Sequence, residues 1–481
     1  MSSPIANTLA AVLAACCFAG QVRALDLPDL GDVSRVSLSE SREAALGGRI
    51  MRQIRSDKGY LRDAELSEYL NNLGDRLAAA NPSPSHHFYF FAVNDPSINA
   101  FALPGGYVGV HTGLIAAARN ESELAGVLAH EIAHVSQNHI ARIVDVQKSS
   151  TLTTLAALAV AILAARSDQG QVSQAAIATA QAMSIQNQLD FTREHEREAD
   201  RIGLQTLANA DFSPSGMATF FERLQAQTRF AESSAPAYLR THPLTFERIA
   251  DIQNRLGETP SRQVPDSLEF KLARAKVMAT QGEAPDAVRR FRGVVAEHPE
   301  DVEALYALTA SALRAGDRGL AVATLAKLEQ RAATPMVASL AARVMLDGKQ
   351  TSQALERLRA ALQKHGTTRP LAEAHADALL HAERGAEAKK VVTEYLRVWA
   401  DDPEFLELLA RANFALGLNA EGHLAQADAL RQQDLLAPAI DQLESARKAG
   451  GDYYTQSIID ARLRELQDRL KQDKNKGERA W

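Results

Sequence analysis

The chain has 481 residues, a formal net charge of −6 and only 5% aromatic residues. This length predicts two or three domains with sizeable cores. The charges are spread along the chain without a basic block or interleaved basic and aromatic residues, so a nucleic-acid partner is not expected.

The first 24 residues predict a secretory signal peptide. An apolar core at 9–20 is too short to span a bilayer, and a small-residue sequence at 22–24 predicts cleavage near Ala24. No Lys or Arg precedes the core, which is atypical. The alternative is a lipobox, LAAC at 13–16, which would leave a lipoprotein anchored through Cys16. Simple cleavage is favoured because the apolar run continues past this cysteine. It would also remove both cysteines of the chain, leaving no disulfide.

Helices and a small β-sheet are expected next. Apolar residues at helical spacing are followed by the helix breaker NPSPS at 81–85. The aromatic run HFYFFAV predicts a strand, and a Pro-Gly-Gly turn predicts a hairpin beside it. If its second strand lies at a sheet edge, a substrate could be held there as an added strand. The expected elements are helices 40–54 and 63–79, a strand at 87–93, and hairpin strands at 97–103 and 107–111.

The stretch VLAHEIAHVSQNH at 127–139 predicts a metal site on a buried helix. Asn120 can cap this helix, with Glu123 three residues on as in a capping box. His130 and His134 are four residues apart and share one face, so both rings can bind one ion. Glu131 can reach a water on that ion. The alternative, two hydrogen-bonded core histidines, would bury two imidazoles and a carboxylate at a considerable cost.

The segment between the metal-site helix and the solenoid supplies more helices. The apolar run at 152–165 is shorter than the ~20 residues of a spanning helix. It predicts a buried helix or a lid over a cleft, with membrane-surface contact as the lesser alternative. His242-Pro243 is expected in a loop. The other expected helices are 192–207, 212–224 and 245–256.

The helix from 192 carries the candidates for a third ligand. Glu196 and Asp200 share a face, whereas Glu198 points about 160° away from Glu196. A ligand and a carboxylate that braces a ligand histidine would use one face, which favours Glu196 on the metal and Asp200 behind it. Interleaved arginines leave a solvated charged helix as the alternative for this segment taken alone.

The C-terminal half has an internal period. Prolines at 265, 299, 335, 370 and 403 lie 33 to 36 residues apart. A period near 34 with two helices per unit is typical of tetratricopeptide repeats, although the full consensus is absent. An ordinary helical bundle is the alternative. Turn glycines are expected at Gly282, Gly316, Gly348, Gly385 and Gly417.

The fold expected is therefore mainly α: an α+β zincin-like metalloprotease domain, helical with a small β-sheet, followed by an α-solenoid of tetratricopeptide-like repeats. A polar stretch at 257–266 predicts the linker between them. The predicted divisions are a signal peptide at 1–24, the protease domain at 25–257, the linker at 258–265, the solenoid at 266–471 and a charged tail at 472–481.

Four motifs occur together in one order: NAFALPGG at 99–106, HEIAH at 130–134, E-x-x-x-D at 196–200, and THP at 241–243 followed by Arg248. This set resembles the zinc metallopeptidases related to the CAAX prenyl protease and the HtpX heat-shock protease. With a signal peptide and a repeat array, the chain resembles a periplasmic branch of that family over nearly its whole mature length.

The resemblance implies one Zn²⁺ per chain, bound by His130, His134 and Glu196. Glu131 would be the catalytic base, and Asp200 would assist as the carboxylate behind a ligand. His242 would be a candidate fourth ligand or switch that keeps the enzyme latent. The residues themselves leave the oxyanion stabiliser open, with His242 and Arg248 as candidates.

The function expected is a zinc-dependent endopeptidase of periplasmic protein quality control. It would degrade misassembled or stalled outer-membrane β-barrel proteins, assist their assembly, and contact the barrel assembly machinery through the repeats. Peripheral membrane contact is left open. The alternative is a chaperone or assembly factor that acts through the repeats, with a latent zinc site. A glutamate at the base position favours the enzyme, because a structural zinc site does not need one.

Overall fold

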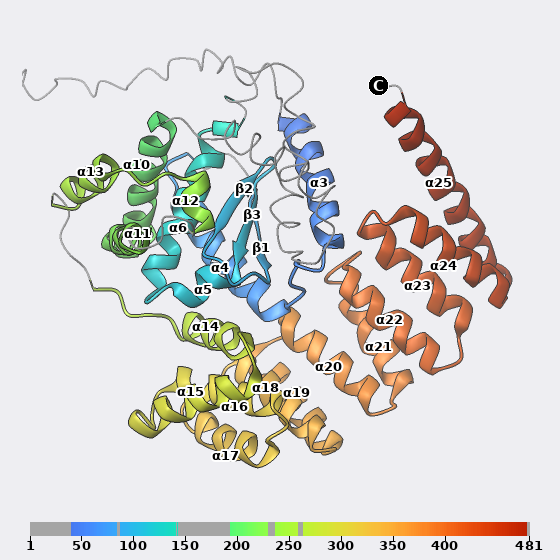
Figure 1. The fold of residues 1–481 in the computed structure, drawn as a ribbon. Coiled ribbons are helices and arrows are strands. Elements are labelled where there is room, and N and C mark those ends of the chain that lie inside the picture. Colours follow the sequence, from blue (N-terminus) through green and yellow to red (C-terminus); the bar gives the residue numbers. More distant parts are fainter. Residues whose placement is uncertain are drawn as a thin grey trace, which may run out of the picture.

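The structure is a computed structural model that describes residues 40–83, 87–140, 142, 193–228, 236–257 and 263–478. It is mainly helical with one small sheet, followed by a curved array of helix pairs (Figure 1). This confirms the expected fold class. Within those ranges, every helix is too short or too polar to cross a membrane. The expected signal peptide and the apolar run at 152–165 lie outside the described residues.

In the part of the chain that the structure describes, the sheet has three strands in the order β1-β3-β2. The predicted hairpin is confirmed, because β2 pairs antiparallel with β3, while β1 pairs parallel with β3 on its other side. The expectation that 107–111 could be an edge was wrong. Strand β3 is central because β1 occupies the side that the hairpin leaves open, a long-range pairing that local turn signals do not reveal. The bounds are β1 Tyr89–Val93, β2 Ala100–Leu103 and β3 Tyr107–His111.

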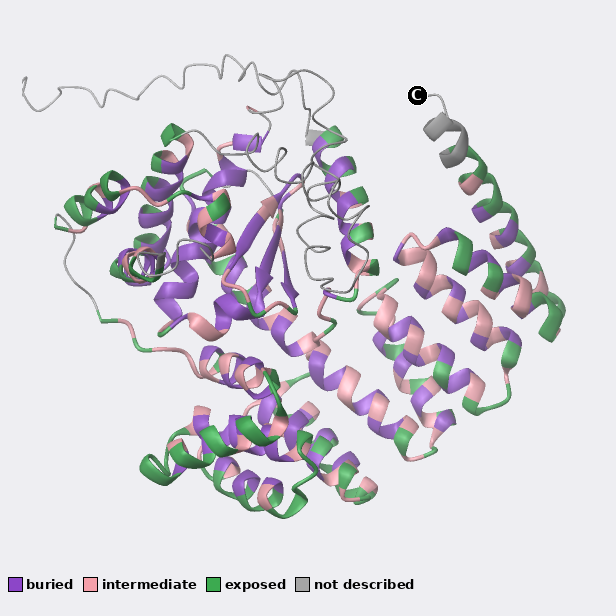
Figure 2. Ribbon diagram, viewed as in Figure 1, coloured by how far each residue is buried: buried purple, intermediate pink, exposed green. Residues whose placement is uncertain are grey.

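Helices cover both faces of this sheet. On one face, Ile50 and Ile54 of α3 pack against Phe91 and Phe101. On the other, α4 and α6 enclose the alternate side chains of the same strands in the main core. Figure 2 shows the strands and α6 as almost wholly buried, whereas α3 exposes its outer face, as the outer solenoid helices do. The helices here are α3 Glu40–Ser56, α4 Ala64–Ala80 and α6 Glu121–Ser136.

The remaining helices of this part surround α6. Most were expected within a few residues, although α11 begins after Pro214 rather than at 212. Neither the six-residue α5 nor the five-residue α12 was expected, because both are shorter than any periodic pattern can indicate. His242 follows it directly as its C-cap, in the loop that was predicted. These helices are α5 Thr112–Ala117, α10 Arg193–Asn209, α11 Ser215–Thr228, α12 Ala237–Thr241 and α13 Phe246–Gly257.

The solenoid stacks helix pairs at the predicted period. Gly282, Gly316 and Gly417 adopt positive φ at turns as expected, but in the other two turns this position is held by Lys349 and Glu383. The helices are α14 Leu268–Thr280, α15 Ala284–Glu297, α16 Val302–Arg314, α17 Arg318–Glu329, α18 Pro335–Asp347, α19 Thr351–His365, α20 Arg369–His381, α21 Gly385–Tyr395, α22 Pro403–Ala415, α23 Asn419–Gln432, α24 Leu436–Ala449 and α25 Tyr453–Glu478.

The solenoid curves back onto the first half of the chain (Figure 1). Phe270 and Val277 of its first helix, α14, belong to the same hydrophobic core as α4 and α6. Farther along, Arg52 of α3 forms an ion pair with Asp434 at 2.5 Å. The predicted division at 258–265 therefore lies between two parts that share a core, and the division itself stays a prediction.

Candidate metal centre

Helix α6 begins as its sequence predicts. The Asn120 side chain accepts a hydrogen bond from the Glu123 N–H at 2.9 Å, which caps the helix start. Glu123 in turn accepts from the Arg119 N–H at 2.7 Å. The whole helix is buried, and His130 and His134 are 0% exposed. Two imidazoles at this depth require partners, because burying an unpaired polar group is costly.

Helix α10 lies directly against α6 and supplies the acids. A Cβ at Gly203 would lie 3.3 Å from the His130 backbone nitrogen, so a small residue allows the close approach. Glu196 and Asp200 are both 2% exposed and face α6. The Glu198 side chain is 29% exposed and points elsewhere. Glu196 and Asp200 therefore share the buried face of α10, as the helical spacing predicts, and Glu198 lies away from it.

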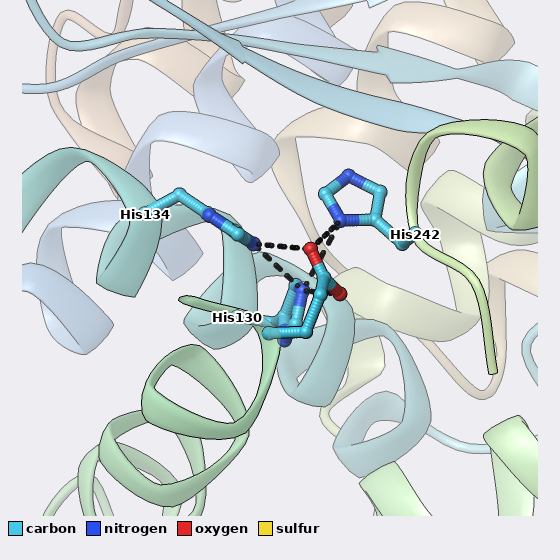
Figure 3. Close-up of side chains that lie close together, drawn as sticks. His130, His134 and His242 are labelled. Carbon is cyan, nitrogen blue, oxygen red and sulfur yellow. Dashed lines mark hydrogen bonds and ion pairs between the residues drawn. The ribbon is translucent and has the colours of Figure 1, made fainter. Parts of the chain in front are cut away.

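Four side chains converge on one point: His130, His134, Glu196 and His242. Figure 3 shows the three labelled histidine rings directed toward one another. The two Nε2 atoms of His130 and His134 are 3.0 Å apart, and Nδ1 of His242 is 3.4 Å from the first of them. The Glu196 carboxylate is 3.5 Å from His130, 3.4 Å from His134 and 3.0 Å from His242.

These spacings fit a tetrahedral metal ion. Donor atoms bound at ~2.0–2.1 Å around such an ion lie about 3.3 Å from one another. The hydrogen-bonding pattern also fits. His130 Nδ1 lies 3.0 Å from Asp200, and a neutral imidazole that donates from Nδ1 presents a lone pair at Nε2. That lone pair points at a second imidazole nitrogen and a carboxylate, an arrangement that a cation stabilises.

Arg248 holds the two acids of α10 from behind. Its guanidinium donates to both oxygens of Asp200 at 2.8 Å, and it lies 2.7 Å from Glu196. It also donates to the Pro243 carbonyl at 2.8 Å, which ties the loop of His242 to the same network. Arg248, predicted as a candidate for the oxyanion contact, is thus already bonded to the two acids and to the loop of His242.

Glu131 lies between His242 and the edge of the sheet. Its carboxylate is 3.5 Å from His242 Nε2, and it accepts a hydrogen bond from the backbone of Ala102. The His111 N–H donates to the Asn99 carbonyl. Because bonded pairs alternate along an antiparallel ladder, Ala102 must turn its backbone groups to the outer edge of β2. The outward-facing backbone of Ala102 therefore lies directly beside Glu131.

The two buried glutamates have pKa values that move in opposite directions. Burial raises the pKa of Glu131 above its ordinary value, although the charges of His242 and His130 oppose this. Burial also raises the pKa of Glu196, but the charge of His242 and hydrogen bonds from the three histidines outweigh it, and the pKa lies well below its ordinary value. One carboxylate is suited to bind a cation and the other to accept a proton.

Two fully buried residues at the site were not selected by the sequence analysis. Tyr238 stacks on His242 with ring centroids 4.7 Å apart, and its hydroxyl has no hydrogen-bond partner in the part of the chain that the structure describes. His139 lies behind His134, with their Nδ1 atoms 2.9 Å apart. The only signal for His139 was its place in the quoted histidine-rich stretch, and Tyr238 gave none.

Comparison with known proteins agrees with this geometry. Residues 64–256 match peptidase family M48. A relative from Vibrio cholerae is 43% identical over 255 residues, which is 53% of this chain and 52% of the relative. The β-barrel assembly-enhancing protease of Escherichia coli (strain K12) is 34% identical over 98% of this chain and 99% of its own length. The one from Yersinia pestis is 32% identical over 92% of this chain and 91% of its own length. The chain belongs to peptidase family M48, as a metallopeptidase related over nearly its whole length to the β-barrel assembly-enhancing proteases.

Proposed function

We propose that the chain is a zinc-dependent endopeptidase that binds one Zn²⁺ at the four convergent side chains. The observation that carries this proposal is the convergence of one donor atom from each of His130, His134, Glu196 and His242, with all four atoms within 4.8 Å of one another. Zinc binds imidazole and carboxylate donors in this geometry, and a catalytic site uses three protein ligands with one replaceable position.

His130, His134 and Glu196 are the proposed permanent ligands. Glu196 is supported over Glu198 by its burial and its contact with both ring nitrogens. Replacement of each acid by glutamine, followed by measurement of zinc content at saturating metal, separates them. Loss of zinc from the Glu196→Gln protein alone is expected. Equal loss from the Glu198→Gln protein would contradict the assignment.

The proton transfers are assigned to Glu131. When bound, the zinc polarises the scissile carbonyl and activates the attacking water. Glu131 takes the proton from that water and passes it to the departing amine. Its raised pKa suits the second step, because the protonated acid must persist long enough to donate. Asp200 acts indirectly, by holding the ring of His130 through Nδ1.

The substrate is proposed to pair with β2 as an added strand. The backbone groups of Ala102 face the open edge beside Glu131, so an extended peptide would place its carbonyl next to the base. Main-chain pairing is tolerant of sequence, which suits an enzyme that acts on unfolded segments. Candidates to stabilise the oxyanion are His242 and the Tyr238 hydroxyl. Arg248 is assigned instead to fixing Asp200 and Glu196.

His242 is proposed to keep the resting enzyme latent. Its Nδ1 lies among the other donors, 3.0 Å from Glu196, where a substrate carbonyl or water would need to enter. It caps a helix of only five residues and precedes Pro243, so a short shift of this loop would remove it. Displacement by substrate or by a partner would then open the site.

The biological setting is taken from the relatives. Their name, β-barrel assembly-enhancing protease, supports a role in the assembly of β-barrel proteins. We place the mature chain in the periplasm, after cleavage near Ala24 or as a lipoprotein, with misassembled outer-membrane barrels as substrates. The solenoid would contact the assembly machinery, because stacked helix pairs form extended binding surfaces.

The test of the enzymatic proposal is Glu131→Gln. This variant is expected to retain one zinc per chain and to lose proteolysis of an unfolded barrel protein by at least ~10³-fold. His134→Ala, which removes a ligand, serves as the control that loses both zinc and activity. Cleavage by the Glu131→Gln protein at the wild-type rate would refute the base assignment and with it this mechanism.

A second function, assistance of assembly without cleavage, is favoured by the curved solenoid that packs against the protease half. The same Glu131→Gln protein distinguishes the two functions. If it still accelerates barrel assembly in a reconstituted reaction, the solenoid has an activity of its own. The proposed division at 258–265 is tested separately by limited proteolysis, which is expected to cut there before it cuts within the repeats.

A further inference from the structure

His139 and Glu198 form a hydrogen-bonded series behind His134, one of the proposed ligands. Nδ1 of His139 is 2.9 Å from Nδ1 of His134, and its Nε2 is 3.1 Å from the Glu198 carboxylate. His139 is 0% exposed. Arg142 donates to the same carboxylate oxygen at 3.1 Å. A buried ring thus connects the centre to an acid that lies outside it.

The ring protons of His134 and His139 can be assigned in one consistent way. His134 directs Nε2 at the centre, so its lone pair is there and its proton is on Nδ1. His139 must then accept at Nδ1 and donate from Nε2 to Glu198. The reverse order would direct a His134 proton at His130, 3.0 Å away. It would also set the lone pair of His139 against a carboxylate.

The backbone explains how His139 reaches this position. Helix α6 ends at Ser136, and Asn138 has a φ of 54°. Asparagine adopts this left-handed conformation more readily than most residues. The reversal turns the chain back, so His139 lies under His134 with ring centroids 4.9 Å apart. A straight continuation of the helix would have placed residue 139 on another face.

We propose that His139 is a positioning residue of the metal centre, through which Glu198 orients His134. The inference rests on the proposed metal site but not on the proteolytic function. The two histidine ligands then have different supports. Asp200 contacts His130 directly, with both partners buried. His134 is supported through a neutral ring, and the negative charge lies near the surface on a side chain that is 29% exposed.

The test measures metal affinity in the full chain without any substrate. His139→Leu keeps the bulk and removes both hydrogen bonds, and it is expected to weaken Zn²⁺ binding 10- to 100-fold in competition with a chelator. His139→Gln can still accept from His134 and donate to Glu198, so it should bind within a few-fold of wild type. The Co²⁺-substituted proteins should show an altered visible spectrum only for His139→Leu.

Two further variants keep the test decisive. Glu198→Ala lies on the outer side of α10, so the fold is expected to survive while affinity falls in the same direction. His195→Phe preserves the ring stacked on His139 at 4.4 Å and should leave affinity unchanged. Wild-type affinity in both His139→Leu and Glu198→Ala would overturn the proposal. Equal weakening by His139→Gln and His139→Leu would do so too. Failure of the endopeptidase proposal would appear instead in the Glu131→Gln assay, with metal binding intact.

Discussion

The two outer edges of the small sheet, on β1 and on β2, make different kinds of contact. The outer edge of β1 is closed by the protein itself. The Asn71 side chain accepts from the Phe90 N–H at 3.0 Å and donates to its carbonyl at 2.8 Å. The Leu61 N–H donates to the carbonyl of Ala92 at 3.0 Å. A side-chain amide and a short backbone segment therefore occupy the groups that another strand would use.

The outer edge of β2 faces the metal centre instead. Ala102 bonds to Glu131, and beyond the strand the Tyr238 N–H donates to the Ile98 carbonyl at 3.2 Å. The partner of this edge is thus the proposed catalytic carboxylate rather than a structural cap. Unpaired edges invite pairing with other chains. If the enzyme acts on unfolded chains as proposed, it benefits from closing the edge where pairing is unproductive and directing the other edge at the proposed catalytic centre.

Among changes to the two edges, the largest effect is expected at β2. Ala102→Pro removes the N–H that faces outward, a substitution that an edge strand tolerates. This N–H donates to Glu131 in the resting protein, and an added substrate strand would take it over, so its loss is expected to lower kcat/KM for an unfolded substrate by ~10²-fold. Zinc content and the circular dichroism spectrum should be unchanged.

Ala102→Gly is the matched control, because it alters the side chain and keeps the N–H. It should remain within a few-fold of wild type. If Ala102→Pro cleaves as fast as Ala102→Gly, substrate does not pair with β2.

The second prediction concerns His242, the donor that lies at the proposed fourth position of the centre. His242→Ala should retain zinc, because His130, His134 and Glu196 remain. Loss of the displaceable fourth donor is expected to raise basal cleavage, including self-cleavage, about tenfold, or ~1.4 kcal/mol. The initial rate on an unfolded substrate, measured alongside zinc content, checks this. A fully metallated variant that is slower than wild type would instead indicate that His242 stabilises the oxyanion.

The third prediction breaks the closed edge. Asn71→Leu leaves the Phe90 N–H and carbonyl without their side-chain partner, at an expected cost of about 1–3 kcal/mol in the free energy of unfolding. Proteolytic kcat/KM should stay near wild type, because this edge lies on the far side of β3 from β2. Denaturant unfolding of Asn71→Leu beside the exposed neighbour variant Asn72→Leu measures the difference. Equal stability of the two would mean that Asn71 does not close the edge.

Local patterns in the sequence predicted much of the fold and the centre. The cap at Asn120, the i and i+4 histidines and the shared face of Glu196 and Asp200 are all properties of single helices, and the structure has them as expected. The proline period likewise predicted the solenoid, since each repeat is a local unit.

What the sequence did not predict depends on contacts between distant segments. The central place of β3 requires its pairing with β1, which no turn signal specifies. The position of His139 depends on the left-handed backbone of Asn138, a conformation that asparagine permits but does not require. Tyr238 comes to the site on a five-residue helix, too short for periodicity to show.

The smallest effect is expected from Glu373. This residue lines a cavity of about 590 Å³ beside the closed edge, together with Asn71 and Tyr89. Burial raises the pKa of Glu373 to about 7, the neighbouring acids of α22 add to this, and Arg369 opposes it. The folded state therefore holds a proton that the unfolded chain has released, so this group's contribution to stability is lost as pH rises from about 4.5 to about 7.

Glu373→Gln mimics the protonated form and should reduce that loss. Because the side chain is 33% exposed, solvent screening should keep the gain at pH 8 below ~1 kcal/mol. Thermal unfolding at pH 5 and pH 8 measures it, with the exposed Glu356→Gln as the control. An unchanged pH dependence in Glu373→Gln would show that this carboxylate already ionises freely beside the closed edge.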